Sequence, residues 1–256
     1  MGVGEQMSDR SGRVLAIDTA TSAVVTGVVE FAGADVTAID TLAERVVTDQ
    51  RRHAEVLTTL MREVLDESGT APTDLRAVVV GCGPGPFTGL RVGMATGAAY
   101  ADALGLPAYG VGTLDAINDA ADTAAAETAE RAGTGIRRLV LTDARRREVY
   151  WALYEGVEQI IGPEVSAPDS LVGRLAERPP ETVIGESRFA ERFGARGVDL
   201  VAPTSASLVR CAGDRIVARA DAAPLTPLYL RRPDAVELKD QKRKALLPPP
   251  PERPAP

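Results

Sequence analysis

The hydrophobic positions of the chain fall into short apolar runs separated by longer amphipathic stretches. In the first half, the apolar runs predict buried strands at residues 14–18, 24–30, 78–81 and 108–111, with a less distinct strand within 36–47. The first two strands form a predicted hairpin with Asp18 at its tip. In the second half, we expect strands at 138–143, 149–155, 182–184 and 199–201, helices at 170–177, 188–193 and 205–220, and an extended segment at 224–231.

Three stretches of the first half are predicted helices. Residues 53–69 place apolar side chains at helical spacing and end at a glycine, and an Ala-rich helix follows at 113–126. Between them, residues 89–105 carry small residues four positions apart, which form one ridge along a helix: Gly89, Gly93, Gly97 and Ala101. Each interior glycine costs roughly 1 kcal/mol relative to alanine, so close approach of another backbone should compensate. The ridge fits packing on the protein's own sheet at least as well as contact with another protein.

The chain contains an internal repeat. The sequence RLVLTD at residues 138–143 aligns with RVLAID at residues 13–18, and the same offset places strand 149–155 on strand 24–30. Both copies read strand, aspartate, polar turn, strand, which favours two structurally related halves. The predicted organisation is a flexible start (1–12), a first half (13–134), a smaller second half (135–238) and a charged, then Pro-rich, disordered tail (239–256).

Composition narrows the class of protein. The 256 residues include 45% hydrophobic and 4% aromatic residues, typical of an α/β protein, and two distant cysteines without a C-x-x-C motif. The net charge is −7, and no large basic patch precedes the tail, so any nucleic acid should be held mainly by another protein. Neither a signal peptide nor a membrane-length apolar run is present, so we expect a cytoplasmic location. His53 is the only histidine, which removes most metal-hydrolase and Ser-His-Asp schemes.

The glycine- and proline-rich loop at residues 83–89 is the first candidate for chemistry. A phosphate cradle presents backbone N–H groups, but Pro84 and Pro86 have none, and no lysine lies between residues 81 and 105. We therefore favour a structural turn, or a loop that touches a partner.

Asp18 and Asp143 are the second candidate, since they occupy equivalent strand ends that should face each other across the cleft between the halves. Together they could hold a magnesium ion or act as a base in phosphoryl transfer. With no third ligand evident, we favour the alternative that each caps a turn through its side chain. We favour a solvated turn for Arg145, Arg146 and Arg147 over the alternative that they bind an acidic partner surface or an anion. We interpret His53 as a solvated or capping residue.

Four motifs together resemble the TsaB (YeaZ) family over residues 13–238: IDTAT at 17–21, GPGPFTGLR at 83–91, DAR with EVYW at 143–151, and PLYLR at 227–231. The second motif is specific, although Pro86 replaces its usual serine. The resemblance implies a duplicated RNase H-like architecture of the actin and sugar-kinase (ASKHA) type, with two mixed sheets flanked by helices. This implied duplication agrees with the internal repeat.

The resemblance also implies a function. Members are essential non-catalytic partners of TsaD, which forms N6-threonylcarbamoyladenosine at position 37 of ANN-decoding tRNAs. The ATPase TsaE docks on the pair, and TsaC (or Sua5) supplies threonylcarbamoyl-adenylate. The resemblance thus implies that the partner proteins bind ATP and metal, and that this chain alone binds no cofactor. It also implies that this chain contacts tRNA only as part of the complex. A homodimer is the alternative state of the isolated chain.

In the family, helices corresponding to 53–68 and 89–105 form the helical interface. The expected interface residues are His53, Leu57, Leu60, Met61, Val64, Gly89, Arg91, Gly93, Gly97 and Ala101. The motif loop comprises Gly83, Pro84, Gly85, Phe87, Thr88 and Gly89. The rival hypothesis is a small-molecule kinase with Asp18 and Asp143 around Mg-ATP, but residues 182–220 lack a Gly-rich adenosine loop. A peptidase is excluded by the single histidine.

Overall fold

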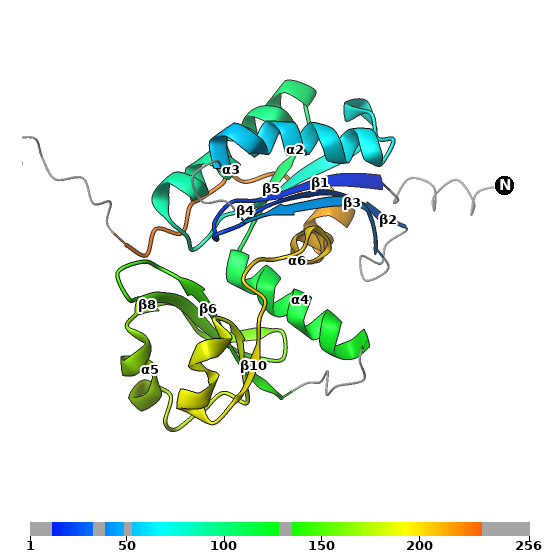
Figure 1. Ribbon diagram of the computed structural model, residues 1–256. Helices are drawn as coiled ribbons and strands as arrows, with labels where there is room; N and C mark the ends of the chain where they lie inside the picture. The colour runs from blue at the N-terminus through cyan, green and yellow to red at the C-terminus, as the bar shows by residue number, and fades with distance from the viewer. Residues whose placement is uncertain (1–11, 33–38, 49–52, 128–134, 232–256) are drawn as a thin grey trace, which may run out of the picture.

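Two mixed five-stranded sheets form the framework of the protein (Figure 1). The structure is a computed structural model that describes residues 12–32, 39–48, 53–127 and 135–231. The predictions for residues 1–11 and for the tail lie outside this part of the chain. Among the described helices, none is both long and apolar enough to cross a membrane.

The first sheet has the strand order β3-β2-β1-β4-β5. Its strands are β1 (Gly12–Asp18), β2 (Val24–Phe31), β3 (Ile39–Val47), β4 (Leu75–Gly81) and β5 (Ala108–Val111). Strands β1, β2 and β3 are antiparallel neighbours, whereas β4 runs parallel to β1 and β5 parallel to β4. Helices α2 (His53–Glu67) and α3 (Phe87–Leu104) cover one face. The other face is covered by a helix from the second half of the chain, described below. Both faces of β1 are buried, which explains its continuous apolar run.

The second sheet repeats this topology. Its strands are β6 (Arg137–Asp143), β7 (Val149–Glu155), β8 (Glu158–Ser166), β9 (Thr182–Gly185) and β10 (Arg196–Val198). Followed from β8, the order β8-β7-β6-β9-β10 has the same antiparallel and parallel pairs as the first sheet. The predicted duplicated α/β fold is confirmed, with Asp18 and Asp143 ending equivalent central strands.

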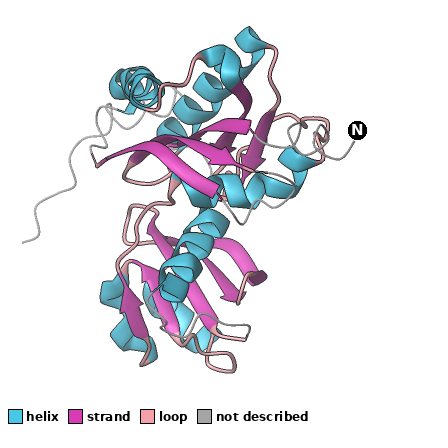
Figure 2. Cartoon of the chain, turned by 90° about the vertical axis from the view of Figure 1, so that its right-hand side faces the viewer, coloured by secondary structure: helices cyan, strands magenta, loops and turns pink. Residues whose placement is uncertain are grey.

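Two helices cross between the halves of the chain (Figure 2). Helix α4 (Thr113–Glu127) follows β5 but packs on the second sheet, where Leu114 and Ile117 lie in one core with Val140. Helix α6 (Ser205–Val217) follows β10 but packs on the first sheet through Leu208 and Val209. Arg210 of α6 donates to Asp119 of α4 at 2.7 Å. Each sheet is therefore completed by a helix from the other half of the sequence.

The second half departs from the predictions in three places. The strand expected at residues 199–201 is wrong: β10 lies three residues earlier, and Val198 and Leu200 pack into the core next to it. Residues 188–193 belong to a 3-10 helix, η2 (Ser187–Phe193), and the predicted helix at 170–177 is the shorter α5 (Pro168–Arg174). Strand β8 was not predicted, because this edge strand is only half-buried and contains a Gly-Pro pair.

The chain ends its described part in an extended segment, residues 221–231, which we call the C-terminal strap. It runs beside the edge strand β5: Leu225 packs into the first core and the Leu228 amide donates to the Cys82 carbonyl at 2.9 Å. Its end reaches the second half, where Arg231 donates to the Ala144 carbonyl at 2.9 Å. A strap with Pro224 and Pro227 covers the sheet edge without extending the sheet, which protects it from pairing with another chain.

The glycine ridge of α3 faces the first sheet. Gly93 and Gly97 are buried, and a Cβ atom would collide with the Thr19 hydroxyl at Gly93 and with the Val80 side chain at Gly97. The Thr19 hydroxyl donates to the Gly89 carbonyl at 2.6 Å and accepts from the Gly93 amide at 2.9 Å. The hypothesis that Gly89, Gly93, Gly97 and Ala101 contact a partner is therefore wrong, because the ridge is used for packing inside the protein.

Replacing Gly93 or Gly97 by alanine should lower the free energy of unfolding by about 1 kcal/mol, measured by urea denaturation. Alanine favours a helix by about 1 kcal/mol, but overpacking a filled contact typically costs about 1–3 kcal/mol and offsets that gain. The matched control is Gly173→Ala in α5, where no atom lies within 4 Å of the added Cβ. This control should leave stability unchanged or raise it by up to about 1 kcal/mol. Equal stabilisation by all three substitutions would contradict the packing argument.

Candidate partner-docking surface

An apolar groove of about 890 Å³ lies between α2 and α3. Its floor and walls come from both helices and from the turn that follows α2. The lining residues are Thr58, Met61, Arg62, Leu65, Asp66, Thr70, Ala71, Pro72, Ala95, Thr96, Ala99, Tyr100 and Ala103. Two charged side chains, Arg62 and Asp66, stand on the α2 side and offer charges of both signs.

Helix α2 supplies the first wall of the groove. Leu57, Leu60 and Val64, which we predicted at a partner interface, are instead buried in the core beneath the helix. This follows from the amphipathic pattern itself, since the most apolar face of α2 covers the sheet. Met61 is the exception, because it is largely buried and also lines the groove. His53 begins α2, but its side chain lies outside the described part of the structure.

Helix α3 supplies the second wall through an alanine ridge that sequence reasoning missed. Ala95, Ala99 and Ala103 recur every four residues, are exposed, and line the groove. They lie on the outer side of the helix, away from Gly93 and Gly97. The spacing of four that these alanines share is visible in the sequence, two positions after the last three members of the glycine ridge. It was overlooked because the glycines have the same spacing and are the more unusual residues in a helix. Small side chains along an exposed ridge allow another helix to approach closely.

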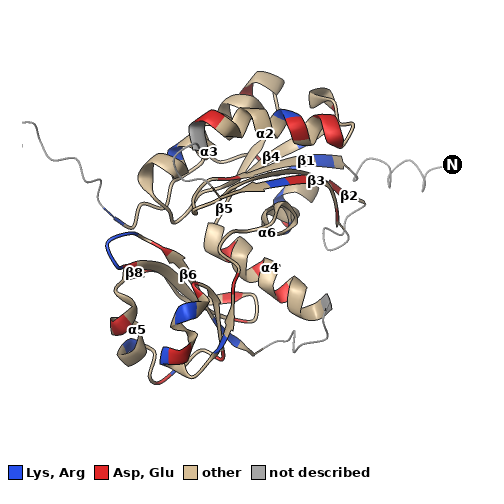
Figure 3. Ribbon diagram, in the orientation of Figure 1, with Lys and Arg blue, Asp and Glu red and all other residues tan. Residues whose placement is uncertain are grey.

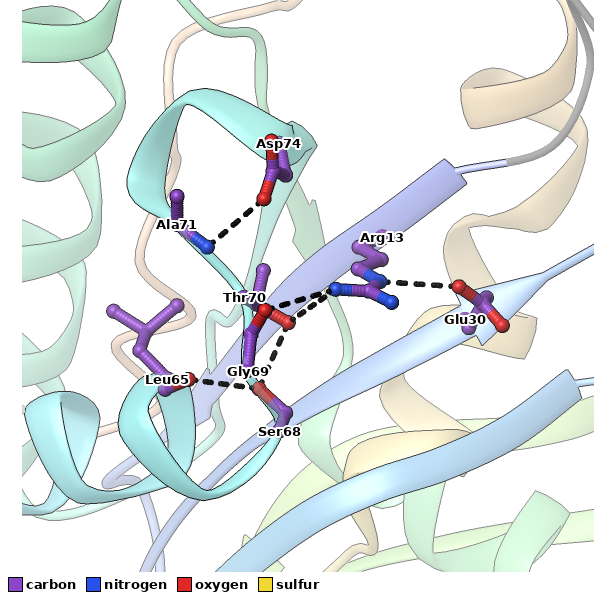
Figure 4. Close-up of polar contacts among 8 residues, drawn as sticks. All are labelled: Arg13, Glu30, Leu65, Ser68, Gly69, Thr70, Ala71 and Asp74. Carbon is purple, nitrogen blue, oxygen red and sulfur yellow. Dashed lines mark hydrogen bonds and ion pairs between the residues drawn. The ribbon is translucent and has the colours of Figure 1, made fainter.

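The C-terminal end of α2 is fixed by a polar network (Figure 4). The Ser68 hydroxyl lies within hydrogen-bond distance of the Leu65 carbonyl, at 3.1 Å, and of the Thr70 hydroxyl, at 2.8 Å. Arg13 of β1 donates to the same Thr70 hydroxyl at 3.1 Å and to Glu30 of β2 at 3.0 Å. The network ties the groove residue Thr70 to the first sheet, so this end of the groove is rigidly placed.

The motif loop at residues 83–89 is held by buried contacts rather than arranged around an anion. The Thr113 amide donates to the Gly83 carbonyl at 2.7 Å, and the Gly83 amide donates to the Thr113 hydroxyl at 3.2 Å. A Cβ on Gly85 would collide with the Ala20 backbone, and Tyr150 of β7 donates to the Gly85 carbonyl at 3.3 Å. The loop therefore joins the two halves, and the preference for a structural turn agrees with these contacts.

The exposed end of this loop carries a cluster of rings and a cation at the start of α3. The Arg91 guanidinium lies 3.9 Å from the centre of the Phe87 ring and donates to the Tyr229 hydroxyl at 2.8 Å. The two rings are 5.1 Å apart. Thr88 and Arg91 are exposed, whereas Gly83, Pro84 and Gly85 are buried. Of the predicted motif-loop residues, Thr88 is exposed and Phe87 is half-buried, whereas Gly89 is buried like the first half of the loop.

Asp18 and Asp143 both cap turns. The Asp18 carboxylate accepts from the Ala20 amide at 3.0 Å, and the Asp143 carboxylate accepts from the Arg145 amide at 2.9 Å. Asp18 is fully buried and also accepts from the Thr113 hydroxyl at 2.6 Å. Burial raises the pKa of Asp18 to about 6, although both hydrogen bonds oppose the rise. The favoured interpretation, a turn cap in each copy, is confirmed by this geometry.

The space between the halves near Asp143 is small. It is lined by Thr21, Ser22, Pro86, Thr142, Asp143, Arg145, Glu186 and Val201, and its volume of about 20 Å³ admits about one water molecule. Asp18 does not line it. Among the described residues no group of three or more His, Cys, Asp or Glu side chains is placed to hold a metal ion. The pair Asp18 and Asp143 is therefore not brought together around a nucleotide-sized space.

The repeated strand order and the crossing helices define the class of protein: a duplicated RNase H-like, ASKHA-type fold. A family model described as "TsaD: tRNA N6-adenosine threonylcarbamoyltransferase" matches residues 41–210. The solved structure of YeaZ from Pseudomonas aeruginosa has a TM-score of 0.63 and 25% identity, and the match covers 86% of this chain and all of that one.

Two sequence relatives add to these matches. An uncharacterized protein of Mycobacterium leprae is 47% identical to this chain. The match covers 87% of this chain but only 55% of the length of that relative. The tRNA threonylcarbamoyladenosine biosynthesis protein TsaB of Escherichia coli is 34% identical over 60% of this chain and 64% of its own length. This chain belongs to the TsaD-related family that the model describes, and within it to the TsaB/YeaZ type.

The buried carboxyl of Asp18 generates a pH-dependent contribution to stability. Its pKa is raised in the folded state, from 3.8 to about 6, so folding favours the protonated form. This contribution is present at low pH and is lost as pH rises through about 6. Between pH 5 and pH 7, the wild type should lose about 1 kcal/mol more unfolding free energy than Asp18→Asn, measured by urea denaturation. Parallel pH profiles for the two proteins would contradict this assignment.

Proposed function

We propose that this chain is a non-catalytic subunit that pairs with a TsaD-type threonylcarbamoyltransferase. The reaction served is formation of N6-threonylcarbamoyladenosine at position 37 of ANN-decoding tRNAs. The name of the E. coli relative and the description of the matching family support this role. The observation that carries the pairing is the apolar groove between α2 and α3 with the exposed alanines of its second wall.

The groove suits a helical partner. Helices pack with axes about 8–10 Å apart, and the shorter separations need small residues at the contact. Ala95, Ala99 and Ala103 meet this need over two turns of α3, while Met61 and Leu65 provide apolar surface beside them. Arg62 and Asp66 can pair with opposite charges at the rim, which favours one orientation of the partner over others.

The non-catalytic assignment is supported by the residues that this chain carries. A TsaD-type site holds its metal with two histidines, and His53 is the only histidine here. The Asp18 carboxylate is occupied by Thr113 and Ala20, which argues against the kinase alternative. We therefore assign ATP and metal to the partners, with TsaE docking on the pair and TsaC (or Sua5) supplying the activated threonylcarbamoyl group. The proposed location is cytoplasmic.

Ala99→Glu should weaken binding of the TsaD-type protein from the same organism at least 100-fold. An unpaired carboxylate buried in an apolar interface costs about 3–5 kcal/mol, which corresponds to this change. The matched control is Ala98→Glu, since Ala98 is exposed on the same helix but does not line the groove. Complex formation is measured by light scattering after size-exclusion chromatography, together with tRNA modification by the mixture.

Four outcomes separate the alternatives. Loss of complex and modification only in Ala99→Glu supports the pairing. If Ala99→Glu keeps both, the groove is not the docking surface. If it instead dissociates a homodimer of the isolated chain and leaves the mixed complex intact, the groove serves self-association. ATP turnover by this chain alone, with no complex, would favour the kinase.

A further inference from the structure

Five arginines from three separate segments gather where the two halves meet. Arg91 comes from the first turn of α3, Arg145, Arg146 and Arg147 form the β6–β7 turn, and Arg231 ends the described strap. Together with the rings of Phe87 and Tyr229 they make up what we call the junction patch. In Figure 3 the arginine turn is the blue loop that projects beside the end of the strap.

Hydrogen bonds, an ion pair and ring contacts connect the three segments of the junction patch. Arg91 stacks on Phe87 and donates to the Tyr229 hydroxyl, as described above. Tyr229 lies two residues before Arg231, which donates to the Ala144 carbonyl and forms an ion pair with Glu148. Ala144 and Glu148 close the arginine turn by the Ala144 amide donating to the Glu148 carbonyl at 3.0 Å. The strap therefore braces the arginine turn next to the ring cluster.

The patch is positive in a chain that is negative as a whole. The net charge of the protein is −7, yet five arginines lie in this patch, where Asp143 forms an ion pair with Arg145 and Glu148 forms one with Arg231. Arg145, Arg146 and Arg147 are all exposed, with φ values of 63°, 53° and 62°. These left-handed conformations are unfavourable for arginine, so the turn is held by its surroundings. Tyr229 is 38% exposed beside it.

We propose that the junction patch contacts the phosphodiester backbone of an RNA, with the exposed Tyr229 ring available for stacking on an unpaired base. This inference rests on the proposed function, in which tRNA is the substrate of the complex. Guanidinium groups bind phosphate with two parallel hydrogen bonds, and arginines interleaved with aromatic rings are the usual composition of a surface for single-stranded nucleic acid. An acidic protein surface would use the arginines but has no comparable use for the rings.

The test measures binding of a fluorescently labelled ANN-decoding tRNA to the complex of this chain with its TsaD-type partner, at several salt concentrations. The variant Arg146→Gln/Arg147→Gln should weaken binding about tenfold and lower the slope of log K against log salt by one to two. Tyr229→Ala should weaken binding several-fold without changing that slope. The matched control, Arg188→Gln/Arg192→Gln on η2, removes the same charge from exposed positions elsewhere and should leave the affinity within twofold.

The outcomes keep this inference separate from the proposed function. Equal weakening by the two double variants, or no weakening by either, overturns the patch while the complex and its activity stand. If Arg146→Gln/Arg147→Gln abolishes the complex itself in size-exclusion chromatography, the patch is a protein contact and the inference is wrong. If the wild-type chains form no complex, the proposed function fails, and the same titration on this chain alone tests the patch. Absence of any RNA binding in that titration overturns it.

Discussion

The hydrogen bond from Thr113 to Asp18 is the contact on which the arrangement of the two halves depends. Asp18 ends the central strand of the first sheet, and Thr113 begins α4, the helix that covers the second sheet. The same threonine exchanges two hydrogen bonds with Gly83 of the motif loop. Gly81 has no side chain because the Asp18 carboxylate fills that space. One buried carboxyl thus fixes the hairpin tip, the loop and the start of the crossing helix.

The inward orientation of Asp18 explains why this carboxyl does not line the small space between the two halves. A carboxylate that faces solvent at the end of a central strand can take part in metal or phosphate chemistry, but Asp18 is turned inward and desolvated. Its counterpart Asp143 keeps the turn-capping contact and remains half-exposed beside Arg145. Duplication has preserved the local geometry of the two aspartates while their surroundings diverged. The surfaces that remain for function are therefore on the outside of the protein.

The sequence predicted best those helices and strands whose hydrophobic periodicity is clear within the element itself. The buried strands of both hairpins and the amphipathic α2 follow directly from periodicity, and the aspartates signalled the repeat. Periodicity shows that a helix has a buried face, but it does not show which sheet that face covers. The exchange of α4 and α6 was therefore not predicted, and Leu57, Leu60 and Val64 were placed at an interface although they belong to the core. The junction patch was missed because its arginines lie in segments far apart in the chain.

Helix α3 takes part in the core packing, in the groove and in the junction patch, and sequence alone could not tell these three roles apart. Its glycines face the sheet, its alanines face the groove, and its first turn places Arg91 against the strap. Since the three faces share one rigid helix, a partner helix in the groove would lie in a fixed relation to the arginine turn that the strap braces. The glycines allow α3 to pack closely on the first sheet, since a Cβ atom at Gly93 or Gly97 would collide with Thr19 or Val80. A packing constraint inside the protein thus determines how both outer surfaces are presented.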